Sequence, residues 1–173
     1  MNKKLLGGFT LIELLIVMAI LGVLAVVVLV AINPVQQLAR TRDAGRKSGI
    51  GQIGRALEAY YTSHNGSYMP ATGGTFLNVL STSGEISTPP SQISFRGGYT
   101  AQVTCSNAQS GWCYLSNLAE AVVYTELESQ SEQSKCLNTA TMFVWSTVDG
   151  RGGIVCGTAP ANPGTAQGWN SVQ

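Results

Sequence analysis

One uninterrupted apolar run constrains this chain more than any other feature. Residues 14–32 are nineteen consecutive residues that are either apolar or glycine. At a rise of about 1.5 Å per residue, a helix of this length covers the roughly 30 Å hydrocarbon core of a bilayer. A secretory signal has a shorter apolar region, of about 7 to 15 residues, followed by its cleavage site. The run therefore predicts a membrane-spanning helix.

The remaining length and its charge describe a single, mildly acidic domain. The chain has 173 residues, which leaves room for one globular domain besides the helix. Residues 1–64 carry seven Lys/Arg against three Asp/Glu, whereas residues 65–173 carry three against six. The cations of the second part, Arg96, Lys135 and Arg151, are far apart in sequence. No nucleic-acid binding is expected of this part.

The cysteines indicate an oxidising compartment. Cys105, Cys113, Cys136 and Cys156 all follow the apolar run, without a C-x-x-C pair, and His64 is the single histidine. A metal site therefore has few candidate ligands, and two disulfides are expected instead. Four cysteines permit three connectivities, and the sequence does not choose among them. A weak preference goes to 105 with 113 and 136 with 156, because each pair brackets a segment that can fold back on itself.

The residues before the apolar run carry a family resemblance. Lys3-Lys4 and Gly7-Gly8 precede Phe9-Thr10-Leu11-Ile12-Glu13, and the apolar helix follows. This order resembles the type IV prepilin signature of pilins and pseudopilins. The resemblance implies that a prepilin peptidase removes a leader of residues 1–8 by cutting after Gly8, and that the new amine of Phe9 is methylated. The chain would be the substrate of both reactions.

Glu13 is the one carboxylate beside the apolar run. A charged side chain in a membrane helix costs about 3 kcal/mol at the bilayer centre and usually has a partner. One interpretation is that Glu13 lies near the interface and extends toward water. The resemblance to pilins favours another, in which Glu13 pairs with the Phe9 amine of a neighbouring subunit during assembly.

A second helical segment is expected over residues 34–64. Asn33-Pro34 interrupts the pattern, so Pro34 either kinks one helix or starts a new one with Asn33 as its N-cap. Apolar residues then recur at spacings of three and four, and His64-Asn65-Gly66 predicts the end. The exit from this helix resembles that of major pseudopilins.

Polar and small residues of this segment allow further expectations. Four glycines, at 45, 49, 51 and 54, indicate close backbone packing, or else a flexible stretch. The charged residues are expected to form a solvated or inter-subunit polar face, paired because their signs are mixed: Arg40, Arg42, Asp43, Arg46, Lys47, Arg55 and Glu58.

The C-terminal part, residues 65–173, predicts an antiparallel sheet. Residues 71–98 read as a long surface connection with a short amphipathic piece at 75–80. Strand-forming residues fill 99–105, 112–118, 121–127, 141–148 and 152–156, and Asp149-Gly150 predicts a two-residue hairpin. Phe143 and Trp145 would form a face against the helix. The tail, 157–173, is expected to be loosely ordered, and Asp149 is too isolated an aspartate to predict calcium.

These features together predict an α+β, pilin-like fold with one long N-terminal helix on a small sheet. The expected segments are a leader (1–8), a membrane and assembly helix (9–33), an amphipathic helix (34–64) and a globular part (65–173).

The expected function is that of a structural subunit of a type IV pilus-like filament or a type II secretion pseudopilus. The resemblance implies as partners copies of the chain, the prepilin peptidase and methyltransferase, and an inner-membrane assembly platform with its ATPase. It implies an inner-membrane precursor with the C-terminal part outside the cytoplasm. Cations that follow the run, at 40, 42, 46 and 47, would by the positive-inside rule favour the opposite orientation, and the cysteines and the leader argue against it.

Two other classes of function remain to be weighed. A bitopic membrane protein that displays a binding or adhesive ectodomain would need neither the cleavage site nor Glu13. An enzyme has little support, because the chain has one histidine, no nucleophile motif and no phosphate loop. No catalytic residue and no cofactor is therefore expected.

Overall fold

The structure is a computed structural model, and it describes residues 8–105, 107–137, 139–160 and 162–170. The chain divides into two compact units, one up to Gln37 and one from Leu38 to Gln173. We describe each by itself and call the second the head unit.

The first unit contains the apolar helix. Helix α1 spans Leu11–Ile32, and none of its residues is buried within the chain. Asn33 follows in the left-handed conformation, with φ of 45°, and helix α2 begins at Pro34. The Asn33 carbonyl accepts hydrogen bonds from the N–H groups of Gln36 (3.0 Å) and Gln37 (3.3 Å). The regular helix is thus interrupted at Asn33, which supplies acceptors for the first turn of α2, while a kink at Pro34 stays a prediction.

Helix α2, Pro34–Ser63, extends into the head unit and forms one side of its core. Its apolar stripe buries Ile50, Ile53 and Leu57 completely. The helix ends where Asn65 and Gly66 take positive φ values of 54° and 73°, close to the expected end at residue 64.

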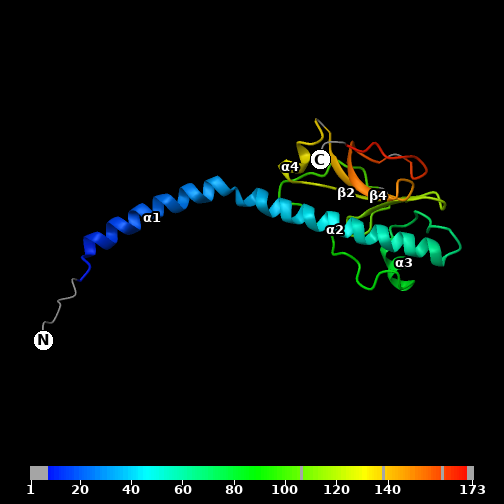
Figure 1. Cartoon of the computed structure of the whole chain (residues 1–173), viewed down its shortest axis with the longest axis horizontal. Helices are drawn as coiled ribbons and strands as arrows, with labels where there is room; N and C mark the ends of the chain where they lie inside the picture. Colours follow the sequence, from blue (N-terminus) through cyan, green and yellow to red (C-terminus); the bar gives the residue numbers. More distant parts are fainter. Residues whose placement is uncertain (1–7, 106, 138, 161, 171–173) are drawn as a thin grey trace. The chain divides into compact units, whose positions relative to one another are not determined.

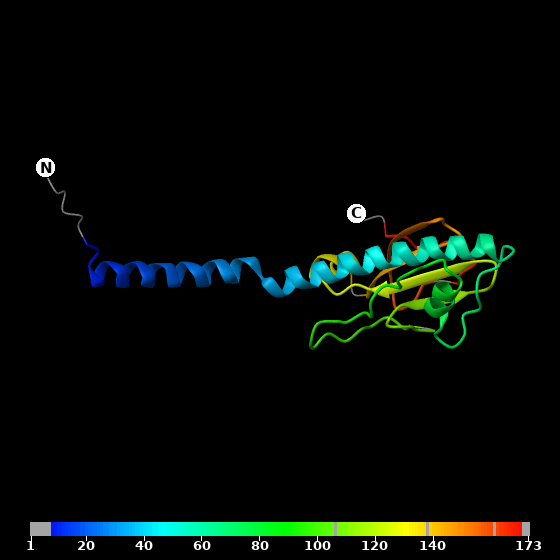
Figure 2. The same cartoon turned by 90° about the horizontal axis from the view of Figure 1, so that it is seen from below.

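The other side of the core is a four-stranded antiparallel meander, in the order β1-β2-β3-β4. The strands are β1 (Cys113–Ser116), β2 (Ala121–Glu126), β3 (Thr141–Ser146) and β4 (Arg151–Cys156). The register places Val123 opposite both Tyr114 and Trp145. Figures 1 and 2 show α2 lying along this sheet within the head unit. The predicted α+β layout, a long N-terminal helix on a small antiparallel sheet, is confirmed.

Two of the glycines in α2 are sites of close packing. A Cβ at Gly49 would overlap the Trp112 ring, and a Cβ at Gly54 would overlap the Trp145 ring. Gly45 has nothing within 4 Å of such a Cβ, and Gly51 has only the side chain of Arg55. The expectation of close packing therefore holds for two of the four glycines, at the points where indole rings from the sheet side meet the helix. Phe143 and Trp145 pack against the core cluster on this side, as expected.

The segment after α2 contributes more to the core than a surface connection would. Helix α3, Phe76–Thr82, buries Phe76, Leu77 and Leu80. The Phe76 ring stacks on Tyr114, with centroids 4.9 Å apart. A second short helix, α4 (Gln130–Gln133), lies between β2 and β3.

Two expectations about the sheet region were wrong. Residues 99–105 form no strand, because the Gln102 and Val103 N–H groups donate to the Glu126 carboxylate (2.7 and 2.8 Å) instead of to a strand. Asp149-Gly150 lies in a four-residue connection, since Ser146 pairs with Arg151.

The tail is also more ordered than expected over its described residues. Trp169 bridges to Val155, and the Asn170 N–H donates to the Ile154 carbonyl (2.8 Å). Pro160 and Pro163 are buried. Backbone pairing along β4 and packing of the partly buried Trp169 ring hold this segment against the sheet.

The cysteines form two disulfides in the structure. Cys105 is bonded to Cys113, and Cys136 is bonded to Cys156. This is the connectivity that the spacing weakly favoured. The second bond joins the chain after α4 to the end of β4, and so closes a loop around β3.

We expect Gly54→Ala to destabilise the head unit by about 1 to 3 kcal/mol, because the new methyl group would overlap Trp145. Gly45→Ala is the matched control. It should stabilise α2 by up to about 1 kcal/mol, since alanine is the better helix former and meets no neighbour there. Urea unfolding of the full chain in detergent, followed by tryptophan fluorescence, measures both. Equal effects of the two substitutions would contradict the assigned packing.

Candidate processing and assembly site

The expected cleavage site is accessible. Gly8, Phe9 and Thr10 precede α1 without regular structure, and Phe9 is 82 % exposed. A Cβ at Gly8 would have no heavy atom within 4 Å. The rest of the leader, with Lys3, Lys4 and Gly7, lies outside the described residues. The Gly8–Phe9 peptide bond thus lies in an exposed segment without regular structure.

Thr10 and Glu13 together cap the start of α1. The Glu13 carboxylate accepts from the Thr10 N–H (2.8 Å) and the Thr10 hydroxyl (2.7 Å), and the Glu13 N–H donates to the Thr10 hydroxyl (3.3 Å). This reciprocal arrangement is a capping box. Sequence reasoning treated Glu13 by its charge alone and did not assign this role to Thr10. The Thr-x-x-Glu spacing was the signal that could have identified it.

Both hydrogen bonds to the carboxylate use the same oxygen, Oε2. Glu13 remains exposed, and Phe9 is four residues before it. A negative charge at the N-terminus of a helix is favoured by the helix dipole. The site therefore holds a solvent-facing carboxylate at a fixed place beside the residue that cleavage would make N-terminal.

The apolar surface of α1 is exposed in the part of the chain that the structure describes. Among the described residues, one helical stretch is long and apolar enough to cross a membrane, and its apolar part is unburied. A helix that is apolar on all sides requires an apolar environment, either lipid or other helices. Within the first unit, the described residues do not supply such an environment, because none of the α1 residues is buried.

A buried charged cluster fixes the start of α2 within the head unit. Asp43 and Arg46 are only 2 % and 4 % exposed, and the Arg46 guanidinium donates to the Asp43 carboxylate (2.7 Å). The same carboxylate accepts from the N–H groups of Glu128 (3.0 Å) and Ser129 (2.8 Å). The expectation of a solvated or inter-subunit face is wrong for these two residues, because the loop after β2 covers them.

The Glu128 carboxylate connects the cluster, because it binds groups from both α2 and the loop at residue 96. Its side chain is fully buried, pairs with Arg42, and lies 3.5 Å from the Arg46 guanidinium. It also accepts from the Arg96 N–H at 2.7 Å. Burial by itself raises the pKa of Glu128, but the hydrogen bonds from Arg96 and Arg42 and the charge of Arg46 outweigh it, so the pKa lies below its ordinary value of 4.5.

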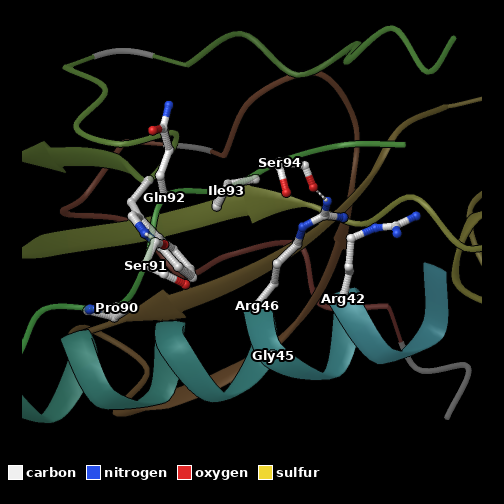
Figure 3. Close-up of a pocket in the computed structure, with 9 residues that line it drawn as sticks. Arg42, Gly45, Arg46, Pro90, Ser91, Gln92, Ile93 and Ser94 are labelled. Atoms are coloured by element: carbon white, nitrogen blue, oxygen red, sulfur yellow. Dashed lines mark hydrogen bonds between the residues drawn. The ribbon is translucent and has the colours of Figure 1, made fainter. Parts of the chain in front are cut away.

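Figure 3 shows both Arg42 and Arg46 projecting from α2, with Arg46 reaching Ser94. The Arg46 guanidinium donates to the Ser94 carbonyl at 2.9 Å. Arg42 and Arg46 line a crevice of about 220 Å³ together with Gly45, Trp112 and residues 90–94. Both guanidinium groups are bound to carboxylates, and the hydrogen bond from Arg46 to Ser94 holds the loop on α2.

The remaining expectations about site chemistry concern metal and His64. No group of three or more His, Cys, Asp or Glu that could hold a metal ion occurs in the described part of the chain. The His64 ring stacks on Tyr60, with centroids 3.7 Å apart, at the end of α2.

We expect the head unit to lose stability on acidification below about pH 4.5. The lowered pKa of Glu128 means that its carboxylate stabilises the fold above 4.5, and that this contribution is lost as the pH falls through the folded-state value. Glu128→Gln should lower the free energy of unfolding by about 3 kcal/mol at neutral pH and flatten its dependence on acid. Glu85→Gln, which alters a single bond from Ser63, is the control. An unchanged acid dependence in Glu128→Gln would contradict this assignment.

Comparison with known proteins supplies one match. The family model "Prokaryotic N-terminal methylation motif" matches residues 7–29. No curated protein and no solved structure matches the chain. The matched residues include the expected cleavage position between Gly8 and Phe9, Glu13 and most of α1. The chain thus carries the prepilin-type signature of type IV pilins and pseudopilins at its N-terminus, and its α+β layout is pilin-like.

Proposed function

We propose that this chain is a structural subunit of a type IV pilus-like filament or a type II secretion pseudopilus. In this proposal a prepilin peptidase cuts after Gly8, Phe9 becomes a methylated N-terminus, and the mature chain polymerises through α1. The methylation motif supports a pilin-like or pseudopilin precursor. The match concerns a structural type of protein rather than a known enzyme.

The observation that carries the proposal is that α1 exposes both its apolar surface and a carboxylate at its start. Twenty-two residues form a helix that buries none of its side chains in its own chain, yet the helix begins with an exposed carboxylate. The charge contributes to the cap of α1, but it is costly in lipid, and a helix that only anchored the protein would give it no ionic partner. Packing of α1 against copies of itself would bury the apolar surface and give Glu13 a partner.

The proposed partner of Glu13 is the Phe9 amine of another copy. Before cleavage the Phe9 nitrogen is an uncharged amide, so the pair becomes available only after the leader is removed. Within one chain the carboxylate is already bound by Thr10 through Oε2. The remaining oxygen, Oε1, can face an incoming subunit. Processing would thereby switch on the electrostatic contact that positions each new subunit.

The machinery and location follow from this proposal. The precursor would wait in the inner membrane as a single-pass protein with the head unit outside the cytoplasm, where both disulfides can form. An assembly platform and its ATPase would then extract it into the filament. The helix exit at Asn65-Gly66-Ser67-Tyr68, with Pro70 after it, resembles secretion pseudopilins, and the two disulfides suit a pilus subunit equally well.

The alternative is a bitopic membrane protein that displays the head unit as a binding or adhesive domain and does not polymerise. The apolar length of α1 fits this reading too. The cleavage site would then have no role and Glu13 would only cap α1, so changing either would leave the binding function intact.

The proposal makes one prediction about processing of the N-terminus. We expect the intact mass of the mature protein to correspond to a chain that starts at methylated Phe9. Gly8→Val should retain residues 1–8, because a β-branched side chain would replace hydrogen at the peptide bond to be cut. Mass spectrometry of membrane-extracted protein measures both. A wild-type chain that keeps its leader would favour the bitopic alternative.

The second prediction concerns assembly. We expect Glu13→Gln to abolish filaments seen by electron microscopy, because the amide keeps an acceptor for Thr10 but loses the charge. Thr10→Ala is the matched control, since it removes the capping hydroxyl and leaves the carboxylate. It should cost about 1 kcal/mol of helix stability and still allow filaments. Filaments in Glu13→Gln, or equal loss in both variants, would refute the proposed charge pairing.

A further inference from the structure

The charged side chains of the head unit are divided between its two ends. We call the end that contains the first turns of α2 the base. It also holds α4 and the loop at residue 96, because Glu132 pairs with Lys47 (2.7 Å) and the Arg96 N–H binds Glu128. We call the opposite end, where α2 finishes, the tip. It holds the turn before β2 and the turn between β3 and β4. Figure 1 shows α4 and α3 toward opposite ends of the head unit.

The carboxylates of the base are buried and bound inside the head unit, whereas several of its cations remain partly or fully exposed. Asp43, Glu126 and Glu128 are each no more than 3 % exposed, and the Glu132 side chain is 14 % exposed. The side chains of Arg42, Lys47 and Lys135 pair with these acids but remain 25 to 31 % exposed. Arg40 and Arg96 are exposed. The surface of the base is therefore positive, although its total composition is mixed.

The tip has the opposite character. It carries four partly exposed carboxylates, which are Glu58, Glu85, Glu120 and Asp149. The first three accept hydrogen bonds from hydroxyl groups, of Tyr68 (3.1 Å), Ser63 (2.7 Å) and Thr147 (2.5 Å) respectively. None of the four forms an ion pair within 4 Å in the described residues. Arg55 is exposed one turn before Glu58 on α2, and the exposed Arg151 stacks on Trp169 at 4.5 Å.

The two surfaces are complementary and cannot meet within one molecule. About 18 residues of α2 separate Arg40 from Glu58, which is roughly 27 Å of helix. This distance is several times the Debye length of about 8 Å at physiological ionic strength. Charges so far apart do not neutralise each other inside the head unit, so each surface remains available to a partner.

We propose that the base of one head unit docks on the tip of another copy, so that opposite charges fix the axial register of the subunits. The inference rests on the proposed filament function and adds a second contact to that of α1. The two surfaces differ and lie at opposite ends, so the contact is heterologous. Such a contact repeats without closing and generates an open filament rather than a two-fold dimer. Long-range attraction between the surfaces also orients a subunit before its apolar helix is buried.

The test exchanges the charges of the two ends. The base-reversed chain carries Arg40→Glu and Arg96→Glu, and the tip-reversed chain carries Glu85→Lys and Glu120→Lys. Several weak exposed pairs act together, so each should reduce the number of filaments about ten-fold or more. The chain with all four substitutions should recover filaments, because the charges are again complementary. Arg55→Glu makes the same change of charge as Arg40→Glu away from the base, and should leave filaments intact.

Circular dichroism, intact mass and the number of filaments seen by electron microscopy separate the possible failures. Circular dichroism in detergent and intact mass establish that each variant is folded and processed. If the wild-type chain forms filaments and both reversed chains form as many, this inference is overturned and the proposed function stands. A wild-type chain without filaments would overturn both. Loss in the base-reversed chain that persists in the fourfold variant would also overturn it, and would point to anionic phospholipid headgroups as the partner of the base.

Discussion

The contact between α2 and the sheet organises the rest of the head unit. Gly49 and Gly54 let the helix backbone approach the indole rings of Trp112 and Trp145, which a side chain at either position would prevent. The approach brings the stripe of Ile50, Ile53 and Leu57 into the core. Once the helix is seated, its polar first turns face the loop after β2. The glycines lower the intrinsic helix propensity, and tertiary packing compensates for that loss.

The charged cluster at the base follows from this seating. Burial of Asp43, Arg46 and Glu128 is tolerable because each group is paired or hydrogen-bonded. The cluster ties α2 to segments more than 80 residues later in the chain. The cluster also determines the charge of the base surface, because its carboxylates are buried while an excess of cations remains exposed. The stability of the head unit and its capacity to attract another copy thus have one structural origin.

The two proposed contacts between subunits, one at the N-terminus and one at the head unit, differ in how their charges arise. At the N-terminus, cleavage would convert an amide into an amine and so create a charge opposite Glu13. At the head unit, the charges are permanent and act over a longer range. A subunit that uses both would be oriented first by its head and then fixed by α1, an order that suits extraction of an apolar helix from lipid.

The sequence by itself determined the features that depend on neighbouring residues. The apolar run, the cleavage signature, the helix end near residue 64 and most strands could be predicted because their signals are local or periodic. Tertiary structure decided the rest. Residues 99–105 have strand-forming composition but bind Glu126 instead, and the tail pairs with β4 through Trp169. Whether Arg46 faces water or Glu128 depends on where a distant loop is placed, and no local pattern encodes a contact between residues so far apart.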